Sequence, residues 1–159
     1  MKFFIFLLAM IATLWGGGVN AASKEAPCVE SRTMVDEAIP GWKTISPNVG
    51  VNVLVQIEAK GSWQYCSHPN CTIDVGGLKT NPTNVPGPEH LFHPGSTVGT
   101  LIGKVGNGEI FAIGTNTAFT SATQGPLKVR MNDLAASGDS TTDNSGKIGV
   151  ILKLCRPSP

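Results

Sequence analysis

Two short polar segments in the last third of the chain carry residue types that could bind a metal ion. Asn132-Asp133 ends one alternating apolar segment, and Asp143-Asn144-Ser145-Gly146 begins another. If two neighbouring strands bring these loop ends together, several carboxylate and amide oxygens point at one place. Such a set suits Ca²⁺, which takes about six to eight oxygen ligands. The pattern therefore predicts a calcium site, although Asn, Asp and Gly are also the residues that form ordinary turns.

Two histidines, His90 and His93, lie three residues apart. On a helix they could share a metal, but Pro88, Pro94 and Gly95 argue against a helix there. We expect loop histidines that face water, with contact of His93 to a ligand at the rim of a site as the alternative. No Gly-x-Ser-x-Gly elbow of a hydrolase occurs, and acidic residues for glycosidase chemistry are scarce, so we expect no enzyme.

The N-terminal segment, residues 1–21, has the pattern of a secretory leader. Met1-Lys2 gives a positive start, and the apolar run 3–15 is too short to span a bilayer comfortably. Val19-Asn20-Ala21 offers small residues where a signal peptidase reads, so we expect cleavage after Ala21. A retained membrane anchor is the alternative. The sequence thus predicts a secreted or periplasmic protein with no membrane contact after cleavage.

The four cysteines, Cys28, Cys66, Cys71 and Cys155, are an even number behind an export signal, which predicts disulfides. Pairing of Cys28 with Cys155 and of Cys66 with Cys71 is the simplest of the three possible connectivities. With His68 between them, Cys66 and Cys71 could also belong to a zinc site. That alternative has only three candidate ligands, in a compartment expected to be oxidising.

The rest of the chain predicts one all-β domain. Charged residues make up 14% of the chain, the net charge is +1 and there are 19 glycines; no basic cluster indicates nucleic acid as a partner. Residues 22–38 are weakly patterned, so we expect a loose lead-in or a short helix before a domain over 39–155. A long proline-rich excursion covers 67–99. Period-two or short apolar segments predict about eight strands of a jelly-roll β-sandwich, at 51–57, 61–65, 100–105, 109–113, 117–120, 127–131 and 148–154 among others.

Three of these segments, taken in order, resemble a known family. They are Thr100 to Gly114 with its Leu-Ile-Gly-Lys-Val-Gly run, Gly125 to Asp133 with its Asn-Asp ending, and Asp143 to Val150 with its Asp-Asn-Ser-Gly start. Together with Gly41-Trp42 and 51–63, they are similar to the galactophilic bacterial lectins typified by the PA-IL lectin (LecA). The resemblance runs from about Pro40 to Leu152. It implies a small jelly-roll β-sandwich, like a galactose-binding domain.

The resemblance also implies a calcium site and its ligands. In the family, the Asp of the Asn-Asp motif and the Asx pair before Ser-Gly bind Ca²⁺ together with backbone carbonyls. Carried over, the side-chain ligands are Asp133, Asp143 and Asn144, and the carbonyl donors come from about Tyr65 and Ser140. The loop between Asp133 and Asp143 is longer than in the typical family member.

The ligand implied by the resemblance is a galactose-like sugar bound directly through the ion, with contacts to Asp133 and Asn144. A His-Pro loop holds the sugar's exocyclic hydroxyl in the family. His93-Pro94 matches it, while the family's partner Gln has no counterpart here. We therefore expect an exported, calcium-dependent, non-catalytic carbohydrate-binding protein, and a homo-oligomer is compatible with this. The alternatives are a secreted structural or protein-interaction module without sugar binding and, less favoured, a small secreted hydrolase.

Overall fold

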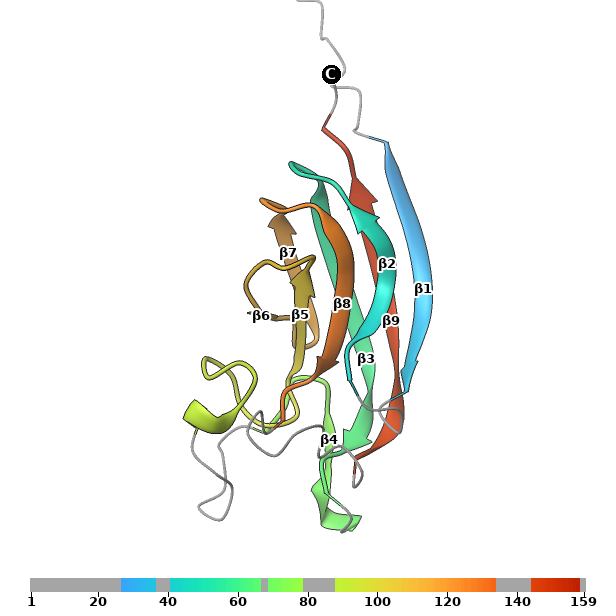
Figure 1. The fold of residues 1–159 in the computed structure, drawn as a ribbon. Helices are drawn as coiled ribbons and strands as arrows, with labels where there is room; N and C mark the ends of the chain where they lie inside the picture. Colours follow the sequence, from blue (N-terminus) through green and yellow to red (C-terminus); the bar gives the residue numbers. More distant parts are fainter. Residues whose placement is uncertain (1–26, 37–40, 67–68, 79–87, 134–143, 158–159) are drawn as a thin grey trace, which may run out of the picture.

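The computed structural model describes residues 27–36, 41–66, 69–78, 88–133 and 144–157, and these form two antiparallel β-sheets packed face to face (Figure 1). In this part of the chain the only helical elements are two 3₁₀ turns, η1 (Pro69–Cys71) and η2 (Pro88–His90). The predicted all-β sandwich is confirmed. None of the described residues belongs to a helix long and apolar enough to cross a membrane.

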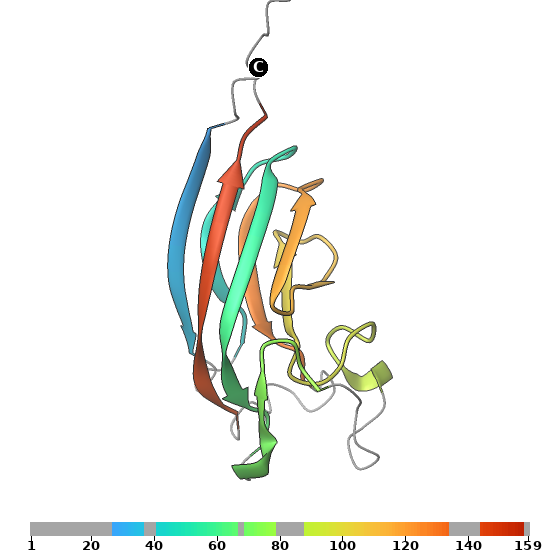
Figure 2. The ribbon, with the colours of Figure 1, turned by 180° about the vertical axis from the view of Figure 1, so that it is seen from behind.

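The five-stranded sheet is centred on β9 and β3, which lie side by side when the molecule is seen from behind (Figure 2). Its order is β1-β9-β3-β4, and β7 also pairs with β3. Pairing of β3 with β9 runs from Leu54↔Cys155 to Gln64↔Ser145. The strands of this sheet are β1 (Cys28–Asp36), β3 (Leu54–Gln64), β4 (Thr72–Asp74), β7 (Asn116–Thr120) and β9 (Ser145–Cys155).

The four-stranded sheet has the order β2-β8-β5-β6, with β8 and β5 at its centre. After β5 the chain makes a tight turn, in which the Gly108 N–H donates to Val105 O at 2.9 Å. The pairing of β2 with β8 contains two register shifts, between Thr44 and Ser46 and between Ser46 and Val49. Its strands are β2 (Lys43–Val49), β5 (Leu101–Val105), β6 (Phe111–Ala112) and β8 (Gly125–Met131).

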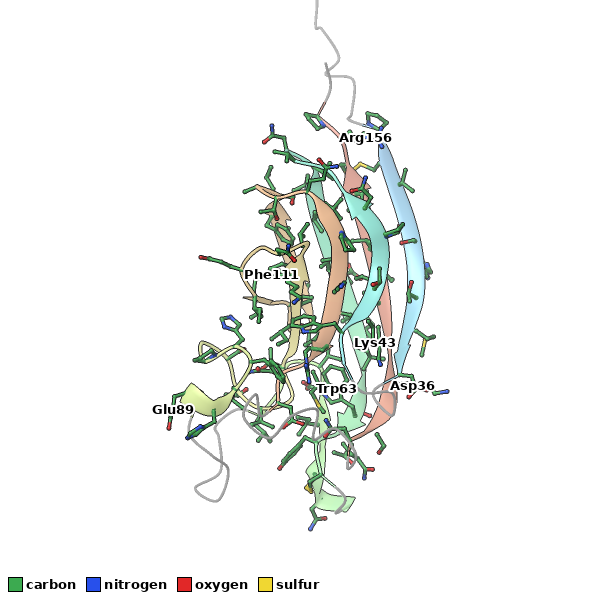
Figure 3. All side chains as sticks on the ribbon, in the orientation of Figure 1. Asp36, Lys43, Trp63, Glu89, Phe111 and Arg156 are labelled. Carbon is green, nitrogen blue, oxygen red and sulfur yellow. A yellow bond between two sulfur atoms is a disulfide. The ribbon has the colours of Figure 1, made fainter. Side chains whose placement is uncertain are left out.

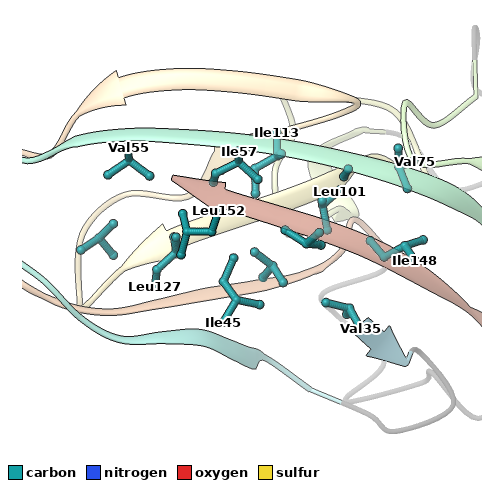
Figure 4. Packing of buried hydrophobic residues seen from close by; sticks show 14 of the residues in the cluster. Val35, Ile45, Val55, Ile57, Val75, Leu101, Ile113, Leu127, Ile148 and Leu152 are labelled. Carbon is teal, nitrogen blue, oxygen red and sulfur yellow. The ribbon is translucent and has the colours of Figure 1, made fainter. Parts of the chain in front are cut away.

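Alternate side chains from both sheets form one core between them (Figure 4). On β3, Val55, Ile57 and Ala59 are buried, while Gln56 and Glu58 face outward. The period of two arises because successive strand side chains point to opposite faces. Facing them are buried residues of the other sheet, chiefly Leu101, Val105, Leu127, Val129 and Met131, and β9 adds Ile148, Val150 and Leu152.

Several strands differ from expectation. The segments expected at 51–57 and 61–65 belong to one strand, β3, which starts at Leu54 because Val51 and Asn52 form the preceding turn, with φ of 62° at Asn52. The expected loose lead-in or helix is wrong for Cys28–Asp36, which is strand β1 and pairs with β9 over its whole length. Strand β2 was not expected. The excursion at 67–99 contains β4, η1 and η2 within its described parts.

Both expected disulfides are present: Cys28 pairs with Cys155, and Cys66 pairs with Cys71. The first joins the ends of β1 and β9, which also face each other in the strand register. It closes a loop with a sequence separation of 127 residues. In the entropy model such a long loop constrains the unfolded chain most, by about 4–5 kcal/mol. The predicted leader cleavage after Ala21 lies outside the described residues.

Candidate metal-binding site

Several chain segments meet at one end of the sandwich, where β3 and β8 end and β9 begins (Figures 1 and 2). The last residue pair of the β3–β9 ladder is Gln64↔Ser145, and the Ser145 hydroxyl donates to Gln64 Oε1 at 2.7 Å. Tyr65 directly follows β3 and Asn144 directly precedes β9. The ladder therefore brings Tyr65 and Asn144 to the same end of two paired strands, as the calcium prediction requires.

Asp133 and Asn144 meet at this end, although eleven positions separate them in the chain. The Asn144 amide nitrogen Nδ2 donates to Asp133 Oδ2 at 2.8 Å, and both side chains are buried, at 4% and 9% exposure. The other amide oxygen, Asn144 Oδ1, is buried and has no hydrogen-bond partner among the described residues. Most buried polar groups in proteins are hydrogen-bonded, so an unpartnered acceptor beside a carboxylate is a candidate position for a cation.

Asn132, the neighbour of Asp133, is fully buried and has a different environment. Its Oδ1 accepts the His93 N–H at 2.9 Å, and its Nδ2 lies 3.0 Å from His93 O. The same Nδ2 lies 3.1 Å from Ser96 O and 3.2 Å from both Ser96 Oγ and Thr97 O. Asn132 thus ties the loop that carries His93-Pro94 to the end of β8.

The same loop is packed from two further sides. The Arg130 guanidinium carbon lies 3.6 Å from the centre of the Phe92 ring and 5.7 Å from that of Trp42. From β3, the buried Trp63 indole N–H donates to Gly99 O at 2.8 Å. Figure 3 shows Trp63 near this end of the sandwich. These contacts fix both ends of the loop relative to the two sheets.

Tyr65 and His93 also lie at this end of the molecule. The Tyr65 N–H donates to Cys71 O at 3.2 Å, across the small loop that the Cys66–Cys71 disulfide closes. That disulfide rules out the zinc alternative, which needed both sulfurs as thiolates. His93 is half-buried and is joined through its backbone to Asn132, next to Asp133.

Two of the predicted ligands, Ser140 and Asp143, lie outside the described residues. Among the described residues no group of three or more His, Cys, Asp and Glu side chains could hold a metal ion. The described part of the site therefore brings together one carboxylate, Asp133, and one amide oxygen, Asn144 Oδ1, while Tyr65 lies at the same end of the paired strands. This all-oxygen donor set fits Ca²⁺ rather than a metal that prefers nitrogen and sulfur.

The sequence pattern does not reveal the contacts that Asn132 makes, because an Asn-Asp pair at the end of a strand is typical of a metal site or of an ordinary turn. The contacts that reveal its role reach 35 to 39 positions back along the chain, to Thr97 and His93.

Comparison with known proteins finds a likeness in fold. No protein-family model matches the chain, and no curated protein sequence matches it. Among solved structures, the N-terminal domain of EclA, described as a PllA-like lectin, is similar with a TM-score of 0.55 and 16% sequence identity. The match covers 77% of this chain and 94% of that chain. At this identity the likeness shows the fold alone: the chain has a β-sandwich similar to that of this domain.

Proposed function

We propose that this protein is an exported, calcium-dependent carbohydrate-binding protein that binds galactose-like sugars and has no chemical step. The observation that carries the proposal is the buried, unpartnered Asn144 Oδ1 beside the Asp133 carboxylate. A cation at this place would satisfy the orphaned acceptor and the neighbouring negative charge together. The lectin-like fold supports a sugar as the ligand.

The proposed ligand set keeps the five residues that the sequence resemblance implies. Asp133 and Asn144 would supply side-chain oxygens, and Tyr65 a backbone carbonyl from the end of β3. Asp143 and Ser140 would complete the set with a side-chain oxygen and a carbonyl. A second carboxylate, from Asp143, would balance the two charges of Ca²⁺, because Asp133 alone supplies one.

When bound, Ca²⁺ has flexible coordination and can take two adjacent sugar hydroxyls in place of water. Around it, the Asp133 carboxylate can accept a hydrogen bond from one of those hydroxyls, and charge-assisted hydrogen bonds are the stronger kind. Asn144 can contact the sugar through its amide nitrogen Nδ2, because its Oδ1 would bind the ion. The geometry of these acceptors would select between axial and equatorial hydroxyls.

His93 would contact the sugar from the rim of the site. Its backbone is held next to Asp133 by Asn132, and its side chain lies in the half-buried region of the loop. An imidazole can donate or accept a hydrogen bond, so it can hold an outer hydroxyl of the sugar. This contact would tune sugar preference, while the ion supplies most of the affinity.

The two disulfides support an oxidising location, secreted or periplasmic, since disulfides persist there. Single lectin sites bind weakly, and assembly of several copies would raise avidity without new contacts at the site. A homo-oligomer is therefore the form in which such a protein would act best on a multivalent glycan.

The proposal is tested on immobilised galactose. The protein should be retained with millimolar calcium and released by a chelator, and Asp133→Asn should pass through unretained. Asn116→Asp serves as the matched control, because Asn116 lies exposed on β7 away from the site and should leave retention unchanged. A glycan array run with and without chelator would identify another sugar. No calcium-dependent binding to any glycan would favour the structural or protein-interaction module.

A further inference from the structure

We propose that Asn132 is a positioning residue for this site: its buried carboxamide, rather than the ion, sets the conformation of the loop 93–99 beside Asp133. The inference rests on the proposed function for its meaning, since the loop carries His93. It divides the site into two parts. One part, the loop, is held by protein contacts alone, and the other part, Asp133 with Asn144, would bind the ion.

The first line of support is the number of loop groups that one side chain satisfies. Asn132 Oδ1 accepts from the His93 N–H, and Nδ2 faces three loop carbonyls and one hydroxyl at 3.0 to 3.2 Å. A carboxamide has two N–H donors and an oxygen acceptor in one plane, so it can bond backbone N–H groups and backbone carbonyls of the loop at the same time. The carbonyls that it serves belong to His93, Ser96 and Thr97.

The second line is the backbone around Asn132. Its N–H donates to Thr100 O at 2.8 Å, and its own carbonyl accepts the Gly99 N–H at 2.9 Å. One residue further, Asp133 O accepts the Phe92 N–H at 3.1 Å. The main chain of 132–133 therefore holds both ends of the loop, while the Asn132 side chain holds its middle.

The third line is that these contacts use none of the side-chain oxygens assigned to the ion. The Asp133 carboxylate accepts a hydrogen bond from Asn144, while the Asp133 main-chain carbonyl accepts one from the Phe92 N–H next to the loop. On its other side the loop is supported by Arg130, whose guanidinium stacks on Phe92 at 3.6 Å. Removing the ion would leave every one of these loop contacts in place.

The consequence for binding is preorganisation. A loop that is already ordered before the sugar arrives loses less conformational entropy on binding, which raises affinity without a new contact. Asn132 is adjacent to Asp133 in the chain and bonds the backbone of His93. Loss of these bonds would therefore let His93 move relative to the ion. The expected effect of removing the Asn132 amide is weaker sugar binding at unchanged calcium affinity.

Hydrogen exchange on the wild-type protein tests the inference directly, with and without chelator. We expect the amides of His93, Ser96 and Gly99 to stay protected when calcium is removed, since their acceptors are Asn132 and the loop itself. An increase in their exchange rates of about a hundredfold or more on chelation would show that the ion orders the loop, and would overturn the proposal.

A variant test separates positioning from simple support. In Asn132→Ala, calcium affinity measured by titration should stay within about threefold of wild type, while the galactose dissociation constant measured in saturating calcium should rise about tenfold or more. Asn116→Ala is the matched control and should change neither. An equal rise of both constants, or no rise in the sugar constant, would contradict the proposal. Should Asn132→Ala fail to fold, the exchange experiment alone decides.

Failure of the proposed function would look different. If the wild-type protein binds neither calcium nor a glycan, the proposed function is wrong. The exchange rates in the absence of calcium would then still report whether Asn132 holds the loop. Rapid exchange of loop amides in the wild type under every condition would overturn the positioning role on its own.

Discussion

Asn132 and Asn144 are both buried asparagines at the same end of the sandwich, and their amides are used in opposite ways. Asn132 has both ends of its carboxamide bonded to the loop 93–99. Asn144 has one bond, to Asp133, and a buried oxygen with no partner in the described part of the chain. A satisfied buried amide fixes structure, whereas a half-satisfied one next to a carboxylate is suited to bind something.

The largest effect should come from Asn132→Ala. It removes the acceptor of the His93 N–H and the amide donor that faces the carbonyls of His93, Ser96 and Thr97, and each lost hydrogen bond in this part-buried region costs free energy. We expect the free energy of unfolding in urea to fall by about 2–4 kcal/mol, by the same amount with calcium and with chelator. A loss that disappears in calcium would break the comparison, because it would tie Asn132 to the ion.

The next effect is stabilisation by calcium itself. A ligand that binds only the folded state at a concentration of one hundred times its dissociation constant stabilises by about 2.7 kcal/mol. The melting temperature should therefore rise on addition of calcium, measured by differential scanning calorimetry. Asp133→Asn should abolish that rise, because it removes the charge without changing the shape of the side chain. A full rise in Asp133→Asn would place the ion elsewhere.

A smaller effect is expected for Trp63→Phe, which tests the support of the loop from β3. The substitution removes the indole N–H that donates to Gly99 O and leaves that buried carbonyl with one bond fewer. We expect a loss of about 1–2 kcal/mol in urea unfolding, again independent of calcium. Unchanged stability would mean that the Asn132 contacts alone hold the loop.

The smallest effect on stability should come from Asn144→Ala in chelator. The substitution loses the bond to Asp133 but also removes the buried unpartnered oxygen, and these two changes oppose each other. We expect a change within about 1 kcal/mol, measured by urea unfolding. A loss as large as that in Asn132→Ala would show that Asn144 is a structural residue like its counterpart.

The sequence predicted the strands that have one buried face. Ile148, Val150 and Leu152 alternate with less buried positions on β9, and Leu127 and Val129 lie on either side of the less buried Lys128 on β8, so the hydrophobic pattern reveals the strand period. The cysteines at 28 and 155 also pair as expected. The strands follow from local composition, and the disulfides follow from a choice among only three possible connectivities.

Two strands were missed for physical reasons. Along β1 only Val35 is buried, so no apolar alternation reveals the strand, and pairing with β9 holds it in place. In β2 the register shifts around Ser46 interrupt the period of two, and Pro47 argues against a strand by composition. A strand that is held by its partner strand, or that contains a bulge, cannot be recognised from its own segment of sequence alone.

The sequence predicted one contact of the candidate site. The Asn-Asp and Asp-Asn-Ser-Gly motifs correctly indicated that Asp133 and Asn144 meet, because both lie at the ends of strands that the sequence predicted. The role of Asn132 was not predictable, since Asn before Asp is also a common turn sequence and its partners lie far back in the chain. A side chain that acts on a distant loop leaves no local pattern.

Calorimetric titration of calcium into the wild-type protein and into Asn144→Ala tests the central claim most directly. The account predicts saturable binding of one ion by the wild type, binding weakened at least about tenfold in Asn144→Ala, and unchanged binding in the control Asn116→Ala. No binding by the wild type at millimolar calcium, or equal affinity in Asn144→Ala, would contradict it.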